Sequence, residues 1–168
     1  MKNLRPNMTR FGLPGFIPLL ITLLMAIIML LPIGTGAANV TMPHLVLISV
    51  FYYMSYRPLL LPYGACAFVG FMLDLWLDVP LGMNMAMLVL TRFFVLNQLK
   101  HYRGKSAVFQ WGTFGLLTVV LYTMSWALMS MINREMWPVV PHLTQWLVTL
   151  FAYAPVALLL GRFRKAFL

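Results

Sequence analysis

The residues that could carry acid–base or ion chemistry are few in this sequence. Its three carboxylates are Asp74, Asp78 and Glu135, and Asp74 lies inside an apolar run between Leu73 and Leu75. A carboxylate at the centre of a bilayer costs about 2.5 to 3.5 kcal/mol, so Asp74 requires a partner if its run spans a membrane. It could tie two helices together, carry a proton or a cation, or dock a membrane helix of another protein.

Small residues precede Asp74 on one face of the predicted helix. Gly64, Ala67, Gly70 and Asp74 follow one another at intervals of three, three and four residues, which places them within about 120° of one another around the helix. Small side chains let helix backbones approach closely in lipid. We therefore expect this face to pack against another helix or a partner, with Asp74 as its polar member.

Arg92 is a second charge inside an apolar run. A tight turn marked by Pro80 and Gly82 lies between it and Asp74, which predicts one helical hairpin containing both charges. Their predicted depths differ by about 6 Å at 1.5 Å per residue, a gap that an arginine side chain can span. Arg92 could pair with Asp74, or it could extend past Phe93 to the inner lipid headgroups.

Signatures of enzymes and metal sites are absent from the sequence. It contains no Gly-rich phosphate loop, no H-E-x-x-H and no G-x-S-x-G. Cys66 is the single cysteine, so a disulfide within the chain is excluded. His44 and His142 each follow a proline, but no cysteine or carboxylate is spaced beside them as a further metal ligand. We predict a protein without catalytic activity, cofactor or metal.

The composition indicates a membrane protein. Of 168 residues, 62% are hydrophobic and 9% charged, and the mean hydropathy is +0.87. A soluble domain of this length would need more polar residues to cover its surface. The net charge of +9 would fit a nucleic-acid binder, but the Lys and Arg residues lie in short segments between apolar runs. There they set membrane orientation, so we do not expect nucleic acid as a partner.

Six apolar runs predict six transmembrane helices in three antiparallel hairpins, forming a single domain over residues 1–168. A bilayer core of about 30 Å takes about 20 helical residues, so the short second run would also fit a re-entrant segment. The first run resembles a signal peptide, but its length favours an uncleaved span. The runs are about 14–33, 41–56, 59–77, 83–99, 108–131 and 143–160.

Charge placement favours six crossings. With a cytoplasmic N-terminus, ten Lys and Arg residues fall inside and one outside, whereas without the second crossing four fall inside and seven outside. The positive-inside rule therefore predicts that both termini are cytoplasmic. The inner loop would hold a basic patch of Lys100, Arg103 and Lys105, which could attract anionic lipid or an acidic partner, or serve topology alone.

Short motifs between residues 42 and 105 are typical of a known family. They are Met42-Pro43-His44-Leu45-Val46-Leu47-Ile48, Tyr52-Tyr53, Gly70-x-x-x-Asp74 and Leu81-Gly82, together with Pro58 and Gly64. In these motifs, in its small size and in its charge pattern, the chain resembles MreD, the rod shape-determining membrane protein family of bacteria. Arg92 is not part of that pattern.

The resemblance implies a non-enzymatic scaffold of the cell-wall elongation complex in the cytoplasmic (inner) membrane. Its implied partners, beside the lipid bilayer, are MreC, the MreB filaments, the RodA glycosyltransferase and a class B penicillin-binding transpeptidase. It also implies a six-helix fold similar to the substrate-binding subunits of energy-coupling-factor transporters. That similarity supplies an alternative, a vitamin-binding transporter subunit. The single alanine of the first run, Ala26, departs from the A-x-x-x-A pattern of such subunits and favours the scaffold.

Overall fold

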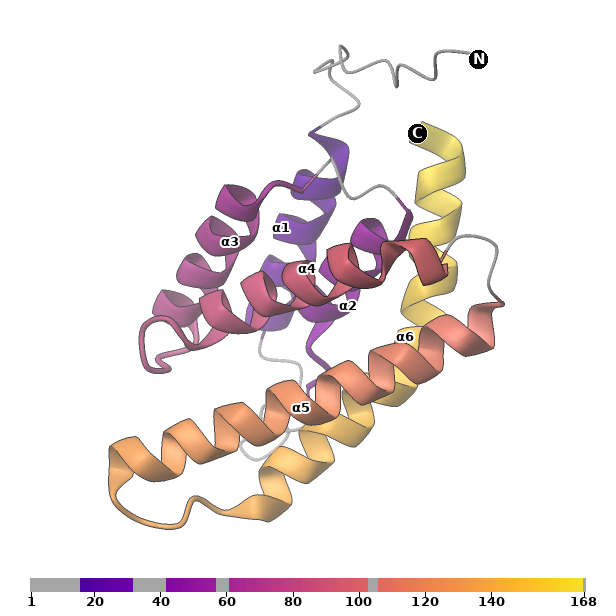
Figure 1. Cartoon of the computed structure of the whole chain (residues 1–168). Coiled ribbons are helices and arrows are strands. Elements are labelled where there is room, and N and C mark those ends of the chain that lie inside the picture. Colours follow the sequence, from indigo (N-terminus) through magenta and orange to yellow (C-terminus); the bar gives the residue numbers. More distant parts are fainter. Residues whose placement is uncertain (1–15, 32–41, 57–60, 103–105, 168) are drawn as a thin grey trace.

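The structure is a computed structural model that describes residues 16–31, 42–56, 61–102 and 106–167 (Figure 1). Within these ranges the chain is all-helical, as predicted, and each of its six helices overlaps one of the six apolar runs. The helices are α1 (Ile17–Leu30), α2 (Leu45–Tyr56), α3 (Tyr63–Trp76), α4 (Met83–Tyr102), α5 (Ala107–Asn133) and α6 (Val139–Phe167).

Helix α2 forms the centre of the bundle. Every residue from Val46 to Met54 is buried, and α2 packs against α1, α4 and α6. A helix that is apolar on all sides is stable only when other helices or lipid surround it. The short second apolar run thus becomes the most enclosed helix of the chain.

A cluster of three rings ties α2 to the last two helices. The ring of Phe51 lies 5.1 Å from that of Phe114 on α5 and 5.9 Å from that of Tyr153 on α6, both edge to face. The rings of Phe114 and Tyr153 stack at 4.6 Å. Such pairs add about 0.5 to 1.5 kcal/mol each beyond the area that they bury.

Among the described residues, α5 and α6 are the two helices long and apolar enough to span a bilayer by length and composition. They pack against each other, and many of their large apolar side chains face outward, including Val108, Met131 and Leu158 at 73 to 79% exposure. Such a surface is stable when the surrounding medium is lipid rather than water. The helices α1, α2 and α3 are shorter, at 14, 12 and 14 residues, and the runs predicted for them include residues outside the described part.

Candidate functional site: a buried carboxylate and its polar network

Asp74 lies in the last turn of α3, where the helix ends in a Schellman motif. The N–H of Leu77 donates to the carbonyl of Leu73, and the N–H of Val79 donates to the carbonyl of Asp74 at 3.4 Å. Asp78 between them has a φ of 52°, the left-handed conformation that this motif requires. This ending turns the chain back sharply, so that α4 begins beside the end of α3.

The partner of the Asp74 carboxylate is the N-terminus of α4. Its Oδ1 accepts from the N–H of Asn84 at 2.7 Å, and its Oδ2 accepts from the N–H groups of Gly82 at 2.8 Å and Met85 at 3.4 Å. Gly82 directly precedes α4, and Asn84 and Met85 lie in its first turn, whose N–H groups have no acceptors within the helix and carry a partial positive charge. The carboxylate, 1% exposed, thus caps a neighbouring helix.

Gly70 makes the approach of α3 to α4 possible. A Cβ added at Gly70 would lie 2.4 Å from the Cα of Met85 and 2.6 Å from its nitrogen, which is closer than any real contact. The two backbones therefore meet one turn before Asp74. The turn before α4 contributes Gly82, whose φ of 96° favours glycine.

The remaining small residues of the predicted face are placed differently. Gly64 is exposed, and a Cβ added there would meet nothing within 4 Å. Ala67 is partly buried. Within the described part of the chain, the close approach expected along this face is made at Gly70 and not at Gly64. Packing of Gly64 against a partner stays a prediction.

Asn84 extends the contact of Asp74 towards α2. Its side-chain Oδ1 lies 3.0 Å from Nε2 of His44, the residue before α2. The other ring nitrogen, Nδ1, accepts from the N–H of Leu47 at 3.3 Å. Because Nδ1 is an acceptor, the proton of the neutral ring sits on Nε2, which donates to Asn84.

Thr149 of α6 joins this network to the last two helices. Its hydroxyl donates to the carbonyl of Gln145 at 2.7 Å, which uses its single proton. It therefore accepts from the N–H of His44 at 3.0 Å and from the hydroxyl of Tyr122 on α5 at 3.2 Å. The buried polar network of Asp74, Asn84, His44, Thr149 and Tyr122 thus connects the ends or sides of five helices.

Sequence reasoning singled out Asp74 but missed most of this network. It treated His44 as a potential metal ligand and did not consider Asn84, Tyr122 or Thr149. Asn84 stands directly after the turn of the hairpin, and its amide in an apolar run is the feature of the sequence that could have indicated a buried polar contact. Among the described residues, no group of three His, Cys, Asp or Glu side chains could hold a metal ion.

Arg92 is held away from Asp74. One of its terminal nitrogens donates to the carbonyl of Leu61 and to the sulfur of Met54, and its guanidinium lies 4.5 Å from the ring centre of Tyr63. Arg92 is 8% exposed, and it follows Asn84 by eight residues, or about 12 Å along α4. The structure thus gives the two buried charges separate partners, the carboxylate at one end of α3 and the guanidinium at the other.

The predicted basic patch of Lys100, Arg103 and Lys105 lies outside the side chains that the structure describes. Near the end of α2, Arg164 of α6 lies 3.9 Å from the ring centre of Tyr56, and the Tyr56 hydroxyl donates to Gln110 of α5 at 3.2 Å. These contacts fasten the end of α2 to α5 and α6.

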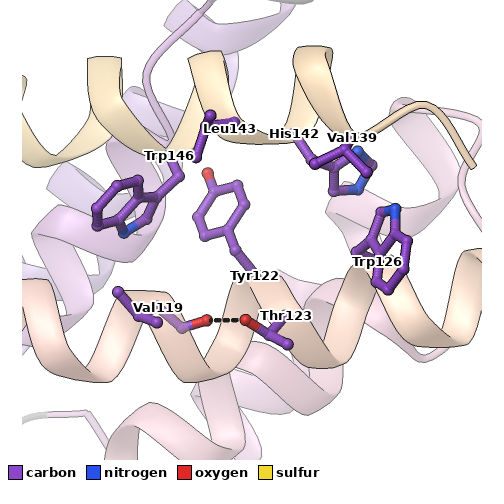
Figure 2. A pocket seen from close by; sticks show the side chains of 8 residues that line it. All are labelled: Val119, Tyr122, Thr123, Trp126, Val139, His142, Leu143 and Trp146. Atoms are coloured by element: carbon purple, nitrogen blue, oxygen red, sulfur yellow. Dashed lines mark hydrogen bonds between the residues drawn. The ribbon is translucent and has the colours of Figure 1, made fainter.

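Two hollows lie beside the network. The larger, of about 280 Å³, lies between α5 and α6, with Trp146 at one end, Trp126 and His142 at the other, and Tyr122 between them (Figure 2). The smaller, of about 80 Å³, reaches His44 and Asn84. Tyr122 and His142 line both, so the hollows meet at these two side chains.

A family model described as rod shape-determining protein MreD matches residues 9–163 of the chain. This chain belongs to the MreD family. The match includes α1 to α5, most of α6 and all five residues of the polar network, so the site is part of the MreD domain. MreD is a shape-determining structural family of membrane proteins associated with the rod-shape complex. Comparison with curated proteins and with solved structures gave no match.

Proposed function

We propose that this MreD-family chain is a non-enzymatic scaffold of the complex that elongates the bacterial cell wall. The family match over residues 9–163 carries the proposal, because it assigns a role in rod-shape determination to nearly the whole chain. The buried polar groups support a scaffold. Both oxygens of Asp74 accept backbone N–H groups, an arrangement that fixes helices and leaves the carboxylate poorly placed to act as a base.

As a scaffold, the protein would bind MreC through its membrane or periplasmic side. Directly or through MreC, it would link MreB filaments to the RodA glycosyltransferase and the class B penicillin-binding transpeptidase. Candidate surfaces for such contacts include the exposed apolar sides of α5 and α6. We propose the basic patch of Lys100, Arg103 and Lys105 as a further contact with partners.

We propose a six-span arrangement in the inner membrane, with both termini cytoplasmic. Helices α2 and α4 run side by side in the same direction, because His44 meets Asn84 near their starts and Met54 meets Arg92 further along. A re-entrant segment would enter and leave on one side, whereas this pairing favours a second crossing. The ten-to-one distribution of basic residues supports the same topology.

Depletion in a rod-shaped bacterium tests the proposed function. We expect round, enlarged cells, since the elongation complex would lose a membrane component. Purification of the tagged protein from the same strain should recover MreC, and mass spectrometry of the eluate identifies it. Normal rods after complete depletion would refute the scaffold.

The larger hollow keeps the vitamin-binding transporter subunit as a second candidate. Its volume of about 280 Å³ approaches the 300 to 1,000 Å³ of small-molecule pockets. We propose that subunits of this transporter class share a fold similar to this chain, so the two functions differ in what the hollow contains. A vitamin-uptake defect in rod-shaped cells, rescued by excess vitamin, would favour the transporter.

A further inference from the structure

We propose that the groove between α5 and α6 binds one phospholipid of the surrounding membrane. We define the α5–α6 groove by six of its lining side chains, Val119, Tyr122, Trp126, His142, Leu143 and Trp146 (Figure 2). In this site a hydrocarbon chain lies between the helices, and the ester or phosphate group of the lipid reaches His142. This binding site goes beyond a scaffold role and does not depend on it.

The walls of the α5–α6 groove accept hydrocarbon because their polar atoms already have partners inside the protein. The indole N–H of Trp126 donates to the carbonyl of Trp137 at 2.9 Å, and that of Trp146 donates to the hydroxyl of Thr118 at 3.1 Å. The Tyr122 hydroxyl donates to Thr149 in the polar network. A polar ligand would bury its own groups here without partners, whereas a hydrocarbon chain has none to satisfy.

His142 is the exception, and it lies at one end of the groove. It is partly buried, and its ring forms no hydrogen bond to any residue that the structure describes. A neutral imidazole offers one donor and one acceptor. Beyond His142, the smaller hollow of about 80 Å³ is lined by Gln145 and Asn84 and has room for water or headgroup atoms. This end therefore suits the polar part of a lipid.

The order of polarity along the groove matches the order in a lipid leaflet. Trp126 and His142 lie near the turn that joins α5 to α6, where indole rings are typical of the membrane interface. Val119 lies seven residues before Trp126, or about 10 Å deeper along α5. A lipid with its headgroup level with the turn would place its chain between Val119 and Trp146.

The size of the groove fits part of a lipid better than an entire small ligand. Its volume of about 280 Å³ is roughly twice that of a 150 Å³ cavity that binds benzene. A chain segment fills this space while the rest of the molecule remains in the bilayer. A small vitamin would instead need most of its surface enclosed.

A matched pair of valines on α5 tests the proposal. Val119 lines the groove, whereas its neighbour Val120 is 51% exposed and lies outside it. Native mass spectrometry of the full chain, released from vesicles of phosphatidylethanolamine and phosphatidylglycerol, measures bound phospholipid. We expect one retained lipid, a loss of about tenfold in Val119→Trp from overfilling the site, and retention in Val120→Trp. His142→Leu should weaken retention more than His142→Gln, which keeps a hydrogen-bonding group.

Photo-crosslinking of the unmodified sequence covers the case in which Val119→Trp fails to fold. A phospholipid with a diazirine in one acyl chain is added to the same vesicles, irradiated, and the labelled peptides are mapped. We expect labelling of Val119 and Leu143 well above that of Leu116, which is 63% exposed outside the groove. Equal labelling of all exposed positions, absence of a retained lipid, or a non-lipid small molecule in its place would overturn the proposal. Normal rod shape after depletion would refute the scaffold but not the lipid site, so the two proposals are tested by different results.

Discussion

The carboxylate of Asp74 accepts the backbone N–H of Asn84 at 2.7 Å, and this bond joins the end of α3 to the start of α4. The side chain of the same Asn84 accepts a hydrogen bond from His44, so one residue connects the helix cap to the network that reaches α6. Two features make the contact possible: the absence of a side chain at Gly70 and the turn at Gly82. The region that carries the family's motifs thus contains three of the five residues of the polar network, His44, Asp74 and Asn84.

Substitutions of Asp74 should follow the order wild type, Asn, Leu in stability. Asp74→Asn keeps one acceptor for the N–H of Asn84 but turns an NH₂ group towards the N–H of Gly82. Asp74→Leu removes all acceptors and leaves the first turn of α4 unsatisfied. Hydrogen bonds to charged groups contribute about 1.5 to 3 kcal/mol each, so we expect Leu to lower the free energy of unfolding more than Asn.

Thermal unfolding in detergent checks this order, with cell shape as the second readout. If Asp74→Asn unfolds as the wild type does but fails to maintain rods, the charge has a role beyond capping. If Leu is as stable as the wild type, the helix cap does not contribute to stability.

Gly70→Ala should destabilise the bundle, whereas Gly64→Ala on the same helix should not. The added Cβ at Gly70 would meet the backbone of Met85 at 2.4 Å, so α3 and α4 must separate. Overfilling of this kind costs about 1 to 3 kcal/mol. At Gly64 the Cβ meets open space, and alanine favours a helix by about 1 kcal/mol. Paired melting curves test this, and equal effects would show that the close approach is absent.

The helices could be predicted from the sequence because long apolar runs bounded by turns leave few alternatives. The partner of Asp74 could not be predicted in the same way. Backbone N–H groups occur at every residue except proline, so the residue types at positions 84 and 85 do not identify their N–H groups as the donors to Asp74. A search for a charged partner instead finds Arg92, which binds Leu61 and Tyr63.

The rest of the network depends on packing between distant segments. His44 and Thr149 are 105 residues apart, and nothing local to either one indicates the other. The helical spacing of Gly64 with Gly70 was informative about the face on which they lie. The spacing does not indicate where the backbone of α4 comes close to α3, because that depends on the turn before α4.

Thr149→Val should loosen the junction between α6 and the start of α2. Valine has nearly the shape of threonine but cannot accept from His44 or Tyr122. Two buried donors would lose their acceptor, which costs about 1 to 3 kcal/mol each. Thr149→Ser keeps the hydroxyl and is the matched control. Denaturant or thermal unfolding should rank Ser above Val, and equal stability of the two would contradict the network.

Asp74 and Arg92 should act independently. Their partners differ, and Arg92 lies about 12 Å along α4 from Asn84, the residue whose N–H binds Asp74. We expect the effects of Asp74→Asn and Arg92→Met on the free energy of unfolding to add within about 0.5 kcal/mol in the double variant. A larger coupling energy would reveal an ion pair that forms in the membrane.

Alkaline phosphatase fusions should reveal six crossings with both termini inside. The helix α2 is only 12 residues long, or about 18 Å, which is shorter than the bilayer core of about 30 Å. Its burial among α1, α4 and α6 favours a full crossing, since surrounding helices can accommodate a short span. Fusions after Ala38, Leu81 and Met136 should be active, and fusions after Tyr56, Lys105 and Leu168 inactive. High activity at Lys105 would exclude this topology, because without the second crossing that loop lies outside.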